Sequence, residues 1–244
     1  MSLLRTLDAL PAELQAEVLS FDAARVLRCA STAARATVAA AQIPAAVVVT
    51  QAFPGGRGLA RAWTGLSAWC SVRAANLSGA HLGVDGARVL AELLRGNVAL
   101  RALELRANAL GDGGARVLAE LLRGNATLQS LGLRANGVGD GGAEALAGAL
   151  RVDGGLRALD LAGNNVGDDG AEALAAALRG NSGLWELNLS RNDVGDEGAA
   201  ALAAALRASS GLRRLNLRGN EVEEEGQRAL REAMRLNPGL RVVL

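Results

Sequence analysis

The residue types that usually carry enzyme chemistry are scarce in this chain of 244 residues. His81 is the only histidine, Cys29 and Cys70 are the only cysteines, and all 26 basic residues are arginine. A lone histidine cannot form a dyad, and neither cysteine has an obvious neighbouring base. The absence of lysine excludes Schiff-base chemistry and a phosphate-loop lysine. The sequence therefore indicates a protein without catalytic residues.

Glycine and aspartate recur in pairs, at 111–112, 139–140, 167–168 and 195–196, but not in the pattern of an ion or nucleotide site. The pairs lack the G-x-x-x-x-G-K motif and the acid spacing of an EF-hand. The chain also has no cluster of cysteine and histidine at metal-ligand spacing. Their repeated position instead suggests a loop in which Asp140 and its equivalents cap the helix that follows. We expect no cofactor and no metal.

Charge and hydropathy exclude two further classes of partner. A net charge of +1 argues against a nucleic-acid binder held by bulk charge. The most apolar stretch, residues 36–50, contains Pro44 and is shorter than the about 20 residues of a membrane span. Charged residues interrupt the region where a signal peptide would lie, and the two cysteines allow either one disulfide or two reduced thiols. We expect a soluble protein of the cytosol or nucleus.

A strict internal repeat dominates the rest of the chain. Leucine, glycine and asparagine recur every 28 residues, as in the series Asn108, Asn136, Asn164, Asn192 and Asn220. Each unit reads L-x-x-L-x-L-x-x-N-x-[LV], followed by a loop and a segment with apolar residues at helical spacing. In the unit from Leu128, Leu131 and Leu133 alternate with other residues, as in a strand with one buried face. The repeat predicts a strand, a loop and a helix in each unit.

A single unit cannot bury its leucine face, so the units must stack on one another. Strands in a sheet lie about 4.8 Å apart, whereas packed helices need about 10 Å. The stack must therefore curve, with a parallel sheet on the concave side and helices on the outside. The sequence predicts an α/β solenoid over residues 71–244, preceded at 43–70 by a degenerate first repeat that acts as a cap.

The units resemble leucine-rich repeats of the ribonuclease-inhibitor type, over roughly residues 70–244. In that family the asparagine points inward and its amide binds backbone groups in the turn. The resemblance therefore implies a structural ladder formed by Asn108, Asn136, Asn164, Asn192 and Asn220. At the C-terminal end, Leu240, Val243 and Leu244 are expected to begin a further strand with an exposed edge, where self-pairing and a truncated sequence are the alternatives.

Residues 1–42 do not follow the repeat and predict short amphipathic helices. The stretch 10–21 resembles the start of an F-box, L-P-x-E-[LI]-x-x-x-[IV]-L-S-F, and the segment from Val26 resembles its second helix. The linker between them is one residue short, and Arg35 or Ala36 replaces the usual aromatic residue. The resemblance implies that a Skp-type adaptor of a cullin ubiquitin ligase binds Leu10, Pro11, Leu14, Val18 and Leu27. The alternative is that these helices only cap the solenoid.

The outward positions of the strands form columns on the concave face and supply the candidate binding residues. Trp185 lies between Arg157 and Arg213 in one column, which is typical of an interface hot spot, although the indole could instead cover the strand edge. The mixed charges of the columns favour a protein partner. The candidate partner-binding residues are Arg106, Arg134, Asp160, Trp185, Glu186, Asn188, Arg213, Arg214, Asn216 and Arg218.

These patterns predict a non-enzymatic protein-protein interaction module. The F-box resemblance implies a substrate-recognition adaptor of a cullin ubiquitin ligase, which would hold its target on the concave face. The alternative is a stand-alone leucine-rich repeat scaffold or regulator, similar to ribonuclease inhibitor.

Overall fold

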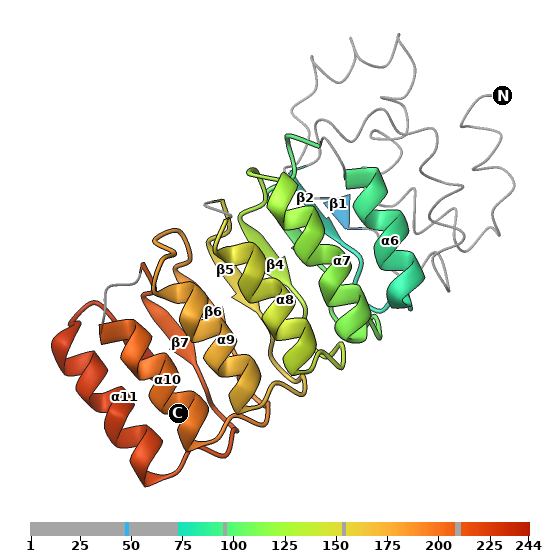
Figure 1. The fold of residues 1–244 in the computed structure, drawn as a ribbon. Coiled ribbons are helices and arrows are strands. Elements are labelled where there is room, and N and C mark those ends of the chain that lie inside the picture. The colour runs from blue at the N-terminus through green and yellow to red at the C-terminus, as the bar shows by residue number, and fades with distance from the viewer. Residues whose placement is uncertain (1–46, 49–72, 95–96, 153–154, 208–210) are drawn as a thin grey trace, which may run out of the picture.

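The computed structural model describes residues 47–48, 73–94, 97–152, 155–207 and 211–244, which form a curved stack of strands and helices (Figure 1). Within these ranges a parallel sheet runs in sequence order. Its strands are β1 (Val47–Val48), β2 (Ala74–Asn76), β3 (Ala102–Glu104), β4 (Ser130–Gly132), β5 (Ala158–Asp160), β6 (Glu186–Asn188), β7 (Arg214–Asn216) and β8 (Arg241–Val243). The helices are α6 (Gly83–Leu94), α7 (Gly111–Gly124), α8 (Asp140–Leu150), α9 (Asp168–Leu178), α10 (Asp196–Arg207) and α11 (Glu224–Leu236).

The strands pair in the register of the sequence repeat. Leu103 of β3 lies beside Leu131 of β4, and Leu131 lies beside Leu159 of β5, so partners differ by 28 residues. Val47 pairs with Ala75 in the same register, although the rest of the segment 43–70 lies outside the described residues. Figure 1 shows the helices side by side in one layer over one face of the sheet. The predicted α/β solenoid is confirmed.

The core is a continuous aliphatic layer between the sheet and the helices. Leu103, Leu131 and Leu159 are each at most 1% exposed, and small helix residues such as Ala143 and Ala171 are fully buried opposite them. Burying a leucine side chain contributes about 1.5–3 kcal/mol relative to exposing it, and each repeat contributes several such residues. The alanines let helices pack closely against the sheet and against one another, which limits the curvature of the stack.

The last strand departs from the repeat. Arg241 of β8 lies beside Arg214 of β7, so this register is 27 residues rather than 28. Val242 therefore packs against the core, whereas Val243, which the repeat places in the strand, is 50% exposed. The cause is a shorter connection, because Pro238 follows α11 closely and the backbone N–H of Leu240 already bonds to the oxygen of Asn237 at 3.0 Å.

Candidate protein-binding face

Inward-facing asparagines form a hydrogen-bonded ladder along the turns that follow the strands. Asn164 donates from Nδ2 to the backbone oxygens of Leu133 (3.0 Å) and Leu161 (2.8 Å). Its Oδ1 accepts from the backbone N–H groups of Asn136 (2.9 Å) and Val138 (3.0 Å). Equivalent Nδ2 bonds are made by Asn108, Asn136, Asn192 and Asn220. Because Asn164 is only 6% exposed, these bonds satisfy buried backbone groups that would otherwise lack partners.

The aspartates of the Gly-Asp pairs form a second ladder, which joins one repeat to the next. Oδ1 of Asp140 accepts from the backbone N–H groups of Gly167 (2.7 Å) and Gly170 (3.0 Å), at the start of α9. Asp168 and Asp196 make the same two bonds to the units that follow them. Each carboxylate thus lies at the N-terminal end of the neighbouring helix, where the helix dipole favours a negative charge.

This arrangement corrects the expectation that Asp140 caps its own helix. Gly139 is the N-cap residue of α8, and no side chain caps that helix. Asp140 is already the first helical residue, whereas a capping side chain belongs to the residue before it. The carboxylate therefore bonds to N–H groups of the adjacent repeat instead.

Trp185 is the most prominent apolar group on the concave side, and it is the only aromatic residue within the described ranges. Its side chain is 57% exposed, and the guanidinium carbon of Arg157 lies 5.6 Å from the ring centroid, within cation–π range. Arg213 follows in the same column and donates its backbone N–H to the oxygen of Trp185 at 2.8 Å. In the neighbouring column Glu186 and Arg214 form an exposed ion pair at 3.7 Å. An exposed indole held by a guanidinium group has the character of an interface anchor.

Asp160, Asn188 and Asn216 shape the ends of their strands. Their Oδ1 atoms accept hydrogen bonds from the backbone N–H two residues later, at 2.9, 3.0 and 3.1 Å respectively. These turns fix where the next residue of each repeat points. The three side chains therefore position the binding face as well as lining it.

Two carboxylates lie close together on the N-terminal part of the face. Glu104 of β3 folds over Gly132 of β4 and occupies the space that a side chain at that position would need. Burial, together with the negative charge of Asp160 beyond it, raises the pKa of Glu104 above its ordinary value. A cationic group of a partner placed here would favour the ionised pair.

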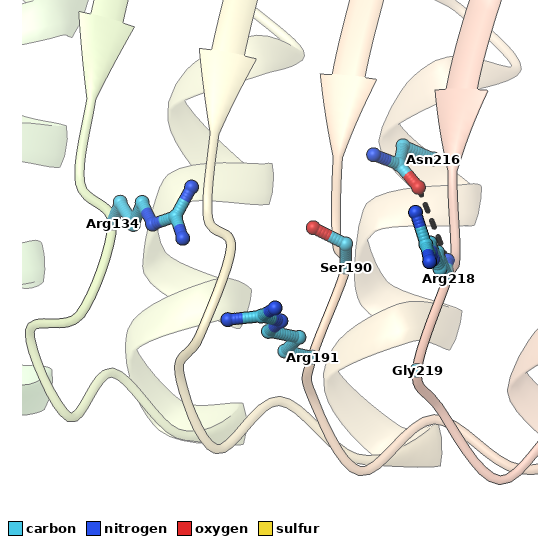
Figure 2. A pocket seen from close by; sticks show the side chains of 6 residues that line it. All are labelled: Arg134, Ser190, Arg191, Asn216, Arg218 and Gly219. Carbon is cyan, nitrogen blue, oxygen red and sulfur yellow. Dashed lines mark hydrogen bonds between the residues drawn. The ribbon is translucent and has the colours of Figure 1, made fainter.

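Arginines surround a hollow of about 290 Å³ near the C-terminal ends of the strands (Figure 2). Figure 2 shows the side chains of Arg134 and Arg191 extending toward one another, with Ser190, Asn216 and Arg218 beside them. In the part of the chain that the structure describes, no carboxylate forms an ion pair with Arg134, Arg191 or Arg218. The polar groups that face the hollow are therefore mainly hydrogen-bond donors.

Sequence reasoning missed Arg191. Its backbone has a φ of 57°, in the left-handed region, at the position where neighbouring repeats carry Ala135, Gly163 and Gly219. A long side chain is uncommon in this conformation. That departure from the small residues of the other repeats is the signal in the sequence that could have identified it.

The remaining candidates are placed as follows. Arg106 is exposed in the column of Arg134 but does not line the hollow. The adaptor-binding candidates Leu10, Pro11, Leu14, Val18 and Leu27 lie outside the described residues. Among the residues that are described, no group of histidine, cysteine, aspartate or glutamate could hold a metal ion, and no helix is long and apolar enough to cross a membrane.

Four segments of the chain match the family model described as leucine-rich repeat, at residues 96–119, 124–147, 156–175 and 181–203. This is a leucine-rich repeat protein. Its repeats resemble the tropomodulin C-terminal domain of Caenorhabditis elegans, with a TM-score of 0.52 and 15% identity over 64% of this chain and 93% of that one. Leiomodin-1 actin-binding site 2 is similar with a TM-score of 0.43 and 21% identity, over 51% and 72% of the two chains. At these identities the likeness concerns the fold, and no curated protein sequence matches the chain.

Proposed function

We propose that this leucine-rich repeat protein is a non-enzymatic protein-protein interaction module that binds its partner on the concave face of the repeats from β5 to β7. The observation that carries the proposal is the exposure of Trp185, at 57%, beneath the guanidinium of Arg157. Tryptophan and arginine are the residues most enriched among interface hot spots. The ion pair of Glu186 and Arg214 beside them supplies the polar rim that such an anchor usually has.

The test compares Trp185→Ala with Val152→Ala. Val152 is 72% exposed in the turn after α8, so it serves as a control for loss of an exposed apolar group away from the face. Partners captured by the tagged chain would be purified, and their affinities measured for both variants. We expect Trp185→Ala to weaken binding about tenfold or more while changing the free energy of unfolding by less than about 1 kcal/mol. A partner that binds the wild type and Trp185→Ala equally well would contradict the proposal.

We further propose that residues 1–42 form an F-box-like segment, which would make the protein a substrate-recognition adaptor of a cullin ubiquitin ligase in the cytosol or nucleus. The support is the sequence pattern of residues 10–21, together with a face on the repeats that could hold a target. The alternative is a stand-alone scaffold or regulator whose N-terminal segment only caps the repeats.

Binding of a purified Skp-type adaptor separates these two functions. We expect tight binding by the wild type and its loss in the double variant Leu14→Asp, Val18→Asp. No binding by a well-folded chain would leave the stand-alone scaffold, without affecting the test of Trp185.

A further inference from the structure

The hollow between Arg134, Arg191 and Arg218 concentrates positive charge that the described residues do not balance. Three guanidinium groups line it, and none is ion-paired within the described ranges. Elsewhere on the same face an arginine does have a carboxylate, as Arg214 has Glu186 at 3.7 Å. Like charges held together repel one another, and a bound anion would relieve that repulsion.

We propose that this hollow binds a phosphorylated side chain of the protein partner. The inference rests on the proposed function, because the hollow lies on the same concave face as Trp185. Its volume of about 290 Å³ is near the lower end of the about 300–1,000 Å³ typical of ligand pockets, which suits one side chain rather than a whole small molecule.

The donors fit a phosphate better than a carboxylate. A phosphorylated side chain carries a charge of about −1.5 to −2 and three strong acceptor oxygens, whereas a carboxylate has one charge and two oxygens. Each guanidinium presents a planar fork of N–H donors that pairs well with phosphate. Ser190 adds a hydroxyl, and Asn216 adds its Nδ2 group, because its Oδ1 already accepts from the backbone N–H of Arg218 at 3.1 Å.

Two features of the backbone keep the hollow open and charged. The column of Arg134 and Ser190 continues through the intervening repeat with Ala162, whose small, buried side chain leaves space between them. Arg191 holds its guanidinium on the other side from a left-handed backbone position, which is an unfavourable conformation for a long side chain. The concave side of a curved stack is also reached more readily by a convex protein than by a flat lipid surface.

The test uses N-acetyl-O-phosphoserine amide as a probe and follows backbone amide signals of the full chain by NMR. We expect saturable shifts at 190–191 and 216–219, with a dissociation constant of about 1–10 mM for so small a ligand. Arg191→Gly should weaken binding about fivefold or more, because it removes a guanidinium while placing in this conformation the residue that tolerates it best. Arg218→Ala should have a similar effect. Arg106→Ala, which removes the same charge from the same column outside the hollow, should change affinity less than about twofold.

Three results would overturn the proposal. One is the absence of saturable shifts at these residues, and another is equal affinity for N-acetyl-glutamate amide. The third is binding to vesicles that contain a phosphoinositide, lost in Arg191→Gly, by a protein that does not bind the phosphoserine probe. Since the probe does not involve a partner, its failure would leave the Trp185 experiment intact, and the two proposals can fail separately.

Discussion

Asn164 shows how one side chain can support two repeats at once. Its amide bonds to backbone groups of its own unit and of the unit before it, at 2.8–3.0 Å, in a site only 6% exposed. Asn164→Ala leaves these groups buried without partners, so the free energy of unfolding should fall by about 1–3 kcal/mol. Urea denaturation measures the change, with Asn165→Ala at the exposed neighbouring position as control. Equal midpoints for the two variants would show that the amide bonds contribute nothing specific.

Glu104 links stability to pH at the residue scale. Because burial and Asp160 raise its pKa in the folded state, the native protein binds more protons than the unfolded chain, and stability falls as pH rises through the ordinary value of 4.5 and above. Glu104→Gln removes this effect. The variant should be more stable than wild type near pH 7, by less than about 1 kcal/mol because the carboxylate is largely exposed, and the difference should vanish at low pH.

Chemical denaturation of both proteins across this pH range measures the effect. Glu120→Gln, on the exposed side of α7, provides the control for a lost surface charge. A Glu104→Gln variant less stable than wild type at pH 7 would mean that the ionised carboxylate stabilises the fold.

At the scale of elements, the start of each helix is shaped by the aspartate of the previous repeat. A Cβ at Gly170 in α9 would lie 2.6 Å from Oδ1 of Asp140 and 2.8 Å from a methyl carbon of Val166, which is fully buried. That oxygen is held by two hydrogen bonds and cannot move away without losing them. Glycine at this position therefore allows the close approach between neighbouring repeats.

The same substitution should have opposite effects at two helical glycines. Alanine favours a helix over glycine by about 1 kcal/mol, so Gly148→Ala in α8, which meets only the mobile end of Arg123, should stabilise the protein. Gly170→Ala should destabilise it by about 1–3 kcal/mol because the clash exceeds that gain. Thermal denaturation of both variants tests the pair, and a rise in Tm for both would refute the proposed constraint.

At the scale of the whole molecule, stability is passed between neighbouring repeats. The strands pair only with adjacent strands in the described sheet, and β8 has a single described neighbour. In such a linear array an interior repeat is held by two interfaces and a terminal repeat by one. Amide hydrogen exchange should therefore be slowest in β5 and β6 and faster by about tenfold or more in β8. Uniform protection from β3 to β8 would show that the solenoid opens as one unit.

Several features of this protein follow from the sequence alone. A constant spacing of 28 residues requires every unit to repeat the same local structure, so it determines the alternation of strand and helix, the parallel order and the inward leucines. The outward column that contains Trp185 follows from the same alternation. None of these features depends on the distance between side chains of different repeats.

Other features were decided by the tertiary structure. The bond of Asp140 to α9, the meeting of Arg134 with Arg191 and Arg218, and the shifted register of β8 all join groups from different repeats. Periodicity indicates which residues share a column, but rotamers, turn lengths and the offset between adjacent units determine which side chains meet. Those quantities are set only when the repeats pack against one another, because packing selects among side-chain conformations that a single repeat leaves open.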